Sequence, residues 1–407
     1  MKTLAFTFAA LVLAHQDGKA ESLDIRDFGA SLSAAPAANA KAVQGALDEC
    51  SRRGGGRVTV PAGVWRCGTI WLRSGVELHL DEGAVLKASE DLSDYNAQDA
   101  YPENWFSKRE QWNGCHFIIA REASGFSITG PGRVDGSGDV FFDDKPLVLY
   151  PKATGWIYGH RNARDKDNLR PGQLISLIRC RDIFVGDGLM VTNSPCWSLL
   201  FYGCTNVVVR GYKVRNGRVD GNTDGMDIDC SCDVTVSDAD IVTGDDGIAI
   251  RADGRHFVGG SAVAPPCERI RVSRCKITSE AMGFRIGVGD GLVRDVVIED
   301  VEIRHASIGA SFETFYEKPE GSGVDIENVT LRNFTVGDCY ANFRLIVGGN
   351  ELKTGVRNVR FENCRLGALL PGVRRGDPAA PPPDVRFDGC VLSPVANSSY
   401  RHLMPAK

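Results

Sequence analysis

The segment Thr205-Asn206-Val207-Val208-Val209 contains a short apolar run that returns as Val234-Thr235-Val236, 27 residues further along the chain. Runs of this kind recur through the second half of the sequence, and many of them follow an Asn or an Asp. They cover residues 183–185, 207–209, 234–236, 270–272, 296–298, 329–331, 359–361 and 385–387, with starts separated by 24, 27, 36, 26, 33, 30 and 26 residues. β-Branched residues, polar turns and a repeat of roughly 25 residues indicate a parallel β-solenoid in which each repeat forms one coil.

A second strand follows many of these runs within a few residues, as in Asp240-Ile241-Val242 and Cys275-Lys276-Ile277. The alternative is a β-sandwich or a propeller, which would need hairpin turns of the Asn-Gly type at regular spacing. Such turns are scarce in this sequence. We therefore predict an all-β chain of 407 residues whose core grows by the addition of coils.

The N-terminal part of the chain has a different pattern. Residues 39–53 have helical spacing through Val43, Leu47 and Cys50, and a glycine run and the strand 58–60 follow. A helix at this place would cover the open end of the solenoid and protect the first sheet edge. We expect one short capping helix.

The totals and the first residues bear on the location of the protein. Lys2, the apolar residues 4–14 and the small residues near Ala20 predict a signal peptide at residues 1–20, the alternative being an apolar N-terminal strand. Residues 21–407 then form a single catalytic domain. The apolar run is too short to span a bilayer, and a net charge of −5 gives no basic surface for nucleic acid. We expect a secreted or periplasmic monomer that binds neither nucleic acid nor a membrane.

The 13 cysteines do not form a metal site by their spacing. Cys275, Cys364 and Cys390 follow the apolar runs at a constant offset, which predicts that they stack inward as small hydrophobic side chains. Disulfides are compatible with export, but the sequence does not indicate their pairing.

Three aspartates stand one repeat apart. Asp224 lies in Asn222-Thr223-Asp224-Gly225, and Asp245 and Asp246 lie 21 and 22 residues later. On adjacent coils their carboxylates would stack about 4.8 Å apart on one face, and like charges that close raise the pKa of one another. Acid/base hydrolysis of glycosides is a leading candidate use of such a cluster. Turn-forming aspartates and a calcium site are the alternatives.

Two groups of motifs carry a resemblance to known families. The start of the chain resembles the pectate-lyase-like right-handed parallel β-helix proteins, in Asp27-Phe28-Gly29-Ala30, Gly54-Gly55-Gly56 and Val60-Pro61-Ala62-Gly63. The middle resembles, in order and spacing, the family 28 glycoside hydrolases, the polygalacturonase family, in Asn193-Ser194-Pro195-Cys196-Trp197, Asn222-Thr223-Asp224-Gly225 and Gly244-Asp245-Asp246. The resemblance covers about residues 23–395.

The resemblance implies an inverting hydrolysis of pectic α-linkages that needs no cofactor and no metal. By position, Asp245 matches the general acid, and Asp224 and Asp246 match the pair that orients and deprotonates the attacking water. Asn222, in the same motif as Asp224, is a candidate substrate contact.

The chain departs from the family where the substrate would be held. Met282 stands where the family's Gly-His-Gly motif has its histidine, and Ser311-Phe312-Glu313 stands for Arg-Ile-Lys. The reversal of charge at Glu313 is expected to repel a galacturonate carboxylate. This predicts a neutral or branched sugar as substrate, such as a rhamnose- or xylose-bearing part of pectin, or a uronate held by other residues.

Two arginines are candidates to replace the missing cations. Strand alternation places Arg285 on the outward face, in a possible column with Asp227, and the alternative for Arg285 is an ion pair with Asp227, Asp290 or Glu313. Arg251 follows the aspartate coil where the family often has a lysine.

Other side chains near these motifs have less specific predictions. Asp227 and Asp229 are expected to have a supporting or surface role beside Asp224. Tyr316 and Trp197 are candidates for stacking on a sugar ring, with packing the preferred interpretation for Trp197. His305 and His256 are isolated in the sequence and are expected at the surface.

The sequence thus predicts a secreted inverting glycoside hydrolase that acts on pectin or a related polysaccharide. Two alternatives stay open. One is a carbohydrate-binding or adhesive β-helix without catalysis. The other is a polysaccharide lyase of the same superfold, which would require calcium and an Arg or Lys base.

Overall fold

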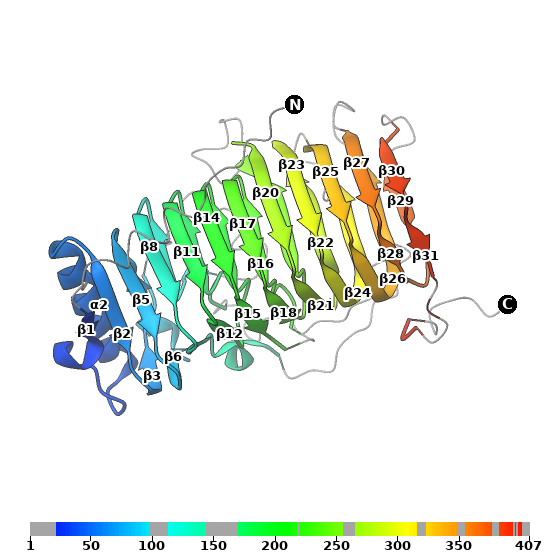
Figure 1. The fold of residues 1–407 in the computed structure, drawn as a ribbon. Coiled ribbons are helices and arrows are strands. Elements are labelled where there is room, and N and C mark those ends of the chain that lie inside the picture. The colour runs from blue at the N-terminus through cyan, green and yellow to red at the C-terminus, as the bar shows by residue number, and fades with distance from the viewer. Residues whose placement is uncertain are drawn as a thin grey trace.

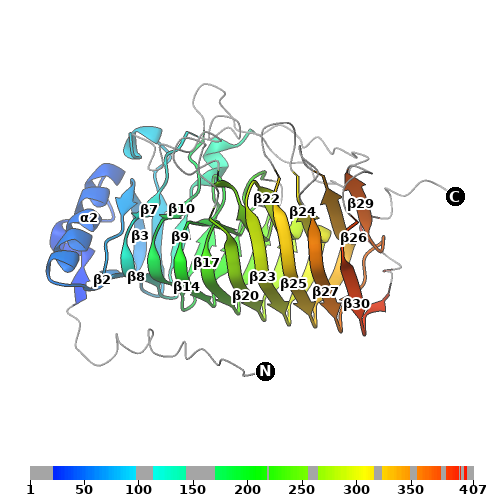
Figure 2. The ribbon, with the colours of Figure 1, turned by 90° about the horizontal axis from the view of Figure 1, so that it is seen from above.

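The computed structural model describes residues 22–97, 113–143, 170–217, 220–254, 265–315, 323–348, 355–376, 382–393, 395 and 398–400. The predicted signal peptide lies outside these residues. Figures 1 and 2 show an elongated stack of coils in which the colour runs from blue at one end to red at the other, so that the chain advances along one axis.

Parallel strands in two sheets build the stack. Within the described residues the first sheet has 12 strands, each hydrogen-bonded to its counterpart in the next coil. Its strands are β1 (Ser22–Asp24), β2 (Gly56–Val60), β5 (Val76–Leu80), β8 (Ser124–Thr129), β11 (Arg181–Gly186), β14 (Thr205–Arg210), β17 (Cys232–Ser237), β20 (Cys267–Ser273), β23 (Leu292–Glu299), β25 (Asp325–Arg332), β27 (Val356–Glu362) and β30 (Val385–Asp388).

The second sheet has 19 strands in the same residues and contains two rows. The rows are joined because the long strands β24 and β26 pair with both of them. Its strands are β3 (Gly63–Cys67), β4 (Ile70–Trp71), β6 (Ala84–Ala88), β7 (Ile118–Arg121), β9 (Arg133–Asp135), β10 (Ile175–Ile178), β12 (Met190–Thr192), β13 (Leu199–Tyr202), β15 (Lys213–Arg215), β16 (Met226–Asp229), β18 (Asp240–Thr243), β19 (Ile248–Ala252), β21 (Lys276–Ser279), β22 (Met282–Gly289), β24 (Glu302–Glu313), β26 (Thr335–Val347), β28 (Arg365–Leu366), β29 (Val373–Gly376) and β31 (Val391–Leu392).

All eight apolar runs of the sequence fall in the first sheet and stack in register. Val207 of β14 lies beside Val234 of β17, which lies beside Ile270 of β20 and then Val296 of β23. These side chains are fully buried, so each coil covers the apolar face of its neighbour. The predicted parallel solenoid is confirmed.

The backbone conformation explains why Asn precedes several of the apolar runs. Asn206, Asn328 and Asn358 have left-handed φ angles of 55°, 54° and 52°, a region that Asn tolerates better than most residues. The side-chain amide of Asn358 donates to Asn328 Oδ1 at 2.8 Å, so these residues also bond from coil to coil. A corner of the coil is therefore fixed by polar stacking outside the core.

The N-terminal end is covered by the helix α2 (Pro36–Arg52), visible beside β1 and β2 in Figure 1. The predicted cap is confirmed, but the helix begins three residues before the predicted Asn39, because Pro36 suits the first turn. Asn39 is instead buried inside the helix, where its amide donates to Ser31 O and Arg66 O at 3.0 and 2.9 Å. Val43, Leu47 and Cys50 face the solenoid, as predicted.

Three short 3₁₀ helices complete the described secondary structure, η1 (Ile25–Phe28), η2 (Leu92–Asp94) and η3 (Gly138–Phe141). None of the described helices is long and apolar enough to cross a membrane. At the opposite end from α2, the last described coil leaves Phe387, Val391 and Leu392 exposed, with 43%, 56% and 58% of their surface accessible.

The cysteines lie inside the stack. Cys275 and Cys364 are buried and Cys390 is partly buried, which agrees with their predicted inward stacking. All thirteen cysteines fall within the described residues, and none of them is in a disulfide. The disulfides that export allowed are therefore not formed in this structure.

Candidate active site

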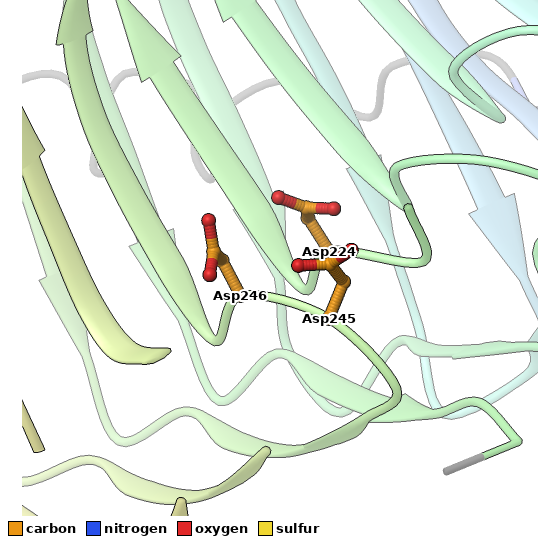
Figure 3. Close-up of side chains that lie close together, drawn as sticks. All are labelled: Asp224, Asp245 and Asp246. Atoms are coloured by element: carbon orange, nitrogen blue, oxygen red, sulfur yellow. The ribbon is translucent and has the colours of Figure 1, made fainter. Parts of the chain in front are cut away.

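The three aspartates meet at the ends of two adjacent coils. Asp224 comes just before β16, and Asp245 and Asp246 come just before β19, which pairs with β16 in register. Carboxylate oxygens of the three residues all lie within 4.8 Å of one another (Figure 3). The predicted stacking on one face is therefore observed.

Glycines beside the carboxylates let the coils approach closely at this point. A Cβ atom on Gly225 would lie 2.5 Å from the carbonyl oxygen of Gly247, and one on Gly247 would lie 2.6 Å from that of Gly283. No side chain fits at such distances. The Asp-Gly pairs of the sequence thus combine a candidate catalytic carboxylate with a residue that the packing requires.

Asp245 is held by backbone and side-chain groups from neighbouring turns. The backbone N–H of Asn222 donates to its Oδ2 at 2.9 Å, and the Ser279 hydroxyl donates to its main-chain oxygen at 2.6 Å. Asn222 adopts a left-handed φ of 55°, and its side-chain oxygen accepts a hydrogen bond from Arg170 at 2.7 Å. Asn222, a predicted substrate contact, therefore also orients Asp245.

Arg170 is a residue that the sequence did not single out. It is 3% exposed, and its guanidinium donates to Pro195 O and Gly221 O at 2.8 and 2.9 Å. It ties the turn before Trp197 to the turn that carries Asn222. Arg170 lies outside the eight repeated runs, so periodicity gave no signal for it.

Asp246 has the strongest partner in the cluster. Arg285 donates to its Oδ2 through Nε and to its Oδ1 through a terminal nitrogen at 3.3 Å, and the Met282 backbone N–H donates to Oδ1 at 3.2 Å. Burial raises the pKa of Asp246, the nearby charge of Arg285 lowers it, and Asp245 raises it again, which brings it to about 6. Asp246 is therefore ionised through most of the neutral range.

Asp224 has a different environment. Its Oδ1 is buried and accepts no hydrogen bond from the part of the chain that the structure describes. Burial, and then the charges of Asp227, Asp245 and Asp246, raise the pKa of Asp224 well above its ordinary value. Two carboxyl groups on adjacent coils thus differ in their tendency to ionise.

The predicted column of Arg285 and Asp227 is present. Asp227 in β16 pairs with Ala249 in β19, which pairs with Arg285 in β22 and then Ser311 in β24. Arg285 is 6% exposed, and its guanidinium reaches Asp246 and, at 3.7 Å, Glu313. The ion pair with Glu313, an alternative prediction for Arg285, is thus observed, and a second one with Asp246 was not foreseen.

Glu313 was expected to face the substrate and repel a galacturonate carboxylate, but the structure places it differently. It is fully buried, and it accepts hydrogen bonds from Arg344 and, at 2.7 Å, from the Ser311 hydroxyl. Burial by itself would raise the pKa of Glu313, but the charges of Arg344 and Arg285 outweigh it and lower the pKa. The negative charge of Glu313 is therefore neutralised by arginines from the coils on both sides.

Arg251 occupies a second buried group of charges. It is 9% exposed and lies 3.8, 3.5 and 3.6 Å from carboxylate oxygens of Asp227, Asp229 and Asp253, with its guanidinium carbon 4.8 Å from the Trp197 ring centre. Asp227 and Asp229 are almost completely buried, so the surface alternative is wrong for both, and the supporting role stays a prediction. Trp197 is packed, as preferred from the sequence.

An apolar column continues from the aspartates on the C-terminal side. Met282 follows Asp246 in the stack, since Gly247 N donates to Met282 O, and it pairs with Ile308 and then Ala341. All three side chains are fully buried and form one cluster. The position of the family's histidine is thus part of a buried hydrophobic cluster.

Several predicted residues lie elsewhere. Tyr316 and His256 fall outside the described residues. His305 is only partly exposed, because it stacks on Tyr400 with ring centres 5.2 Å apart and accompanies Glu280 and Asp338. The three clustered aspartates have the spacing to ligate a cation, but Arg285 already supplies a positive charge to Asp246.

The fold and the site together define a parallel β-helix protein with three clustered carboxylates at the ends of adjacent coils. The comparisons with known proteins specify the class further. The family model for glycosyl hydrolases family 28 matches residues 50–345, which is more than half of the chain. The chain belongs to this family of glycoside hydrolases, and the predicted family and all-β fold are confirmed.

Relatives with known names are distant. The chain is 27% identical over 329 residues to a probable polygalacturonase of Vitis vinifera. The match covers 78% of this chain and 61% of that protein. It is 27% identical over 318 residues to an endo-polygalacturonase of Pectobacterium parmentieri. This match covers 72% of this chain and 76% of that protein.

Among solved structures, the exopolygalacturonase of Thermotoga maritima has the same fold, with a TM-score of 0.66, 19% identity and 92% of each chain covered. The endo-xylogalacturonan hydrolase of Aspergillus tubingensis gives a TM-score of 0.61 at 15% identity, with 93% and 94% covered. These structures support the right-handed parallel β-helix as the fold.

Proposed function

We propose that the protein is a secreted glycoside hydrolase that cleaves α-glycosidic bonds of pectin, or of a related polysaccharide, with inversion. Residues 1–20 are its export signal, and residues 21–407 form one catalytic domain. The observation that supports this proposal is the clustering of three carboxyl groups within 4.8 Å, of which one, Asp246, is held by an arginine. Relatives in the family are polygalacturonases by name, which suggests a pectic substrate.

Each carboxyl group has a proposed role. Asp245 is the general acid that protonates the leaving oxygen, and Asp224 and Asp246 bind and deprotonate the attacking water. The ion pair with Arg285 supports a base role for Asp246, because it favours the charged form. No step of this mechanism requires a metal or a cofactor.

The surroundings of the aspartates support a substrate that is not plain polygalacturonate. Arg285 is paired with two carboxylates, Glu313 and Arg344 neutralise each other, and Met282 belongs to an apolar cluster. The charges of this buried group are matched within it, and Met282 adds no charge. We infer a neutral or branched unit next to the cleaved bond. Arg251 is the remaining candidate for holding a uronate, and three carboxylates already surround it.

Hydrolysis of defined pectic fractions tests the activity. Polygalacturonate, rhamnogalacturonan and xylogalacturonan are incubated with the protein, with and without EDTA, and reducing ends and the absorbance of unsaturated products are followed. Asp245→Asn should lower the hydrolysis rate by about 10²–10⁴-fold, because it removes the general acid. Asp238→Asn is the matched control, since Asp238 is an exposed aspartate between the same two motifs, and it should leave the rate unchanged.

The same assay separates the alternatives. Metal-dependent unsaturated products would show a lyase, and binding of a polysaccharide without any turnover would show a non-catalytic β-helix.

The stereochemistry needs its own measurement. Carboxylate oxygens within 4.8 Å are closer than the roughly 6.5–9.5 Å usual for inverting enzymes, so the distance alone does not favour inversion. Proton NMR of the first product should show the anomer opposite to the substrate linkage. Retention of configuration would replace the water mechanism with a covalent one.

A further inference from the structure

Four charged side chains of alternating sign connect the aspartate cluster to a residue three coils away. Asp246 is bonded to Arg285 of β22, Arg285 faces Glu313 of β24, and Glu313 is bonded to Arg344 of β26. The three strands are neighbours in the stack, as Figure 1 shows. The series begins at a proposed catalytic carboxylate and ends at a side chain that has no access to solvent.

Glu313 is the link on which the series depends. Its Oε1 accepts from Arg344 and from the Ser311 hydroxyl, whereas its Oε2 is buried, accepts no hydrogen bond from the described residues and lies 3.7 Å from Arg285. That distance is too long for a direct hydrogen bond. Arg285 therefore directs two N–H groups to Asp246 while a second carboxylate lies within reach.

Arg344 determines how strongly that second carboxylate attracts Arg285. It is fully buried and donates to Ser311 Oγ at 2.9 Å as well as to Glu313, so its guanidinium is fixed against the glutamate. A buried carboxylate without a cation is unstable, and it recruits any positive charge nearby or becomes protonated. Arg285 is the other cation that faces Glu313.

We propose that Arg344 is a positioning residue for the hydrolytic site: by neutralising Glu313 it leaves Arg285 on Asp246 and keeps Asp246 ionised. Arg344 has 0% exposure and so acts through Glu313 and Arg285 and not by touching a sugar. The inference rests on the proposed function for the catalytic role of Asp246, but the arrangement of charges can be tested without turnover.

The charged groups that act on Asp246 come from four places in the fold. They are Asp224 before β16, Asp245 beside it in the chain, Arg285 of β22 and Glu313 of β24. Arg375 of β29 acts electrostatically on Arg344 from the next coil. Of these groups, only Arg285 and Glu313 join Asp246 to Arg344 through a continuous set of ion pairs.

The test is a pH titration of the full-length protein with ¹³C-labelled aspartate carboxyl groups, in which the signal of Asp246 is assigned by its loss in Asp246→Asn. Arg344→Gln should raise the titration midpoint of Asp246 by about one pH unit, because Glu313 then attracts Arg285. Arg285→Gln gives the full size of the effect. The double variant Glu313→Gln/Arg344→Gln removes the competing charge and should restore a midpoint at or below that of the wild type.

Two further variants exclude a general structural effect. Arg344→Lys keeps the charge but loses the planar fork, and its midpoint should lie between those of the wild type and Arg344→Gln. Arg375→Gln changes a cation near Arg344 that belongs to no ion pair of the series, and it should leave the midpoint unchanged. If Arg344→Gln does not fold, the Asp246 midpoints of Arg344→Lys and of the double variant test the proposal in its place.

The outcomes are distinct from those of the activity assay. An unchanged Asp246 midpoint in folded Arg344→Gln and Arg344→Lys, or a double variant that fails to restore it, would overturn the proposal. Where a pectic fraction is hydrolysed, the acid side of the kcat/KM profile should move with the NMR midpoint. If the midpoints shift as expected but no polysaccharide is hydrolysed, the charge coupling stands and the proposed activity fails.

Discussion

Asp224 and Asp246 show how one partner changes the behaviour of a carboxyl group. Both are buried and both lie beside Asp245, but Arg285 bonds to Asp246, and Asp224 Oδ1 has no hydrogen-bond partner in the described chain. The pKa of Asp246 is about 6, and burial raises that of Asp224 well above its ordinary value. Arg285 therefore favours the charged form of Asp246 more than that of Asp224.

Asp224→Asn should stabilise the protein at neutral and alkaline pH while reducing activity. The pKa of Asp224 is raised in the folded state, so its contribution to stability is fully present below the ordinary value of 3.8 and is lost as pH rises through the folded pKa. Asparagine keeps the shape without the charge. We expect Tm to increase by roughly 1–3 °C at about pH 8, and the difference from the wild type to shrink towards about pH 4. Calorimetry across this range gives the answer, and a difference independent of pH would refute the electrostatic origin.

At the scale of the element, the helix α2 has a task that strands cannot perform. A solenoid coil exposes apolar side chains and unpaired backbone groups at its end, and α2 covers them at the N-terminal side. Its buried face uses Val43, Leu47 and Cys50, while Lys41 on the other face is exposed.

Leu47→Ala should destabilise the protein by about 2–5 kcal/mol, because Leu47 is fully buried between the helix and the first coils. Lys41→Ala in the same helix is the control and should change stability by less than about 0.5 kcal/mol. Denaturant unfolding measures both. Equal effects of the two substitutions would mean that the helix does not act as a cap.

The strands and the cap could be predicted from the sequence because they follow repeated or helical spacing. The same holds for the meeting of Asp224 with Asp246, since the distance between them is about one coil. The partners of Glu313 could not be predicted, because Arg344 lies 31 residues away, and side chains across coils meet only when the loop lengths are known. From the sequence, the reversed charge at Glu313 was expected to face the substrate. Its burial between Arg285 and Arg344 depends on the packing of three strands, which the sequence pattern does not show.

At the scale of the whole molecule, stability comes from stacked coils without covalent cross-links. Thirteen cysteines are spread along the stack, and none of them is in a disulfide. Native disulfides typically contribute about 2–5 kcal/mol, so their presence would be easy to detect.

We therefore expect a thiol reductant to leave the Tm of the protein unchanged. The measurement is a thermal melt with and without dithiothreitol, accompanied by titration of thiols in the denatured protein. A lower Tm under reducing conditions, together with fewer than 13 titratable thiols, would show that oxidation adds bridges after folding.

The two ends of the stack differ, and this gives unfolding a direction. One end is closed by α2, and the last described coil exposes Phe387, Val391 and Leu392. Because each coil is stabilised mainly by its neighbours, the terminal coil with one neighbour frays most easily. Amide exchange and proteolysis should therefore advance from β30 and β31 inward, and the coils of Asp224 and Asp246 would persist until several others had been lost.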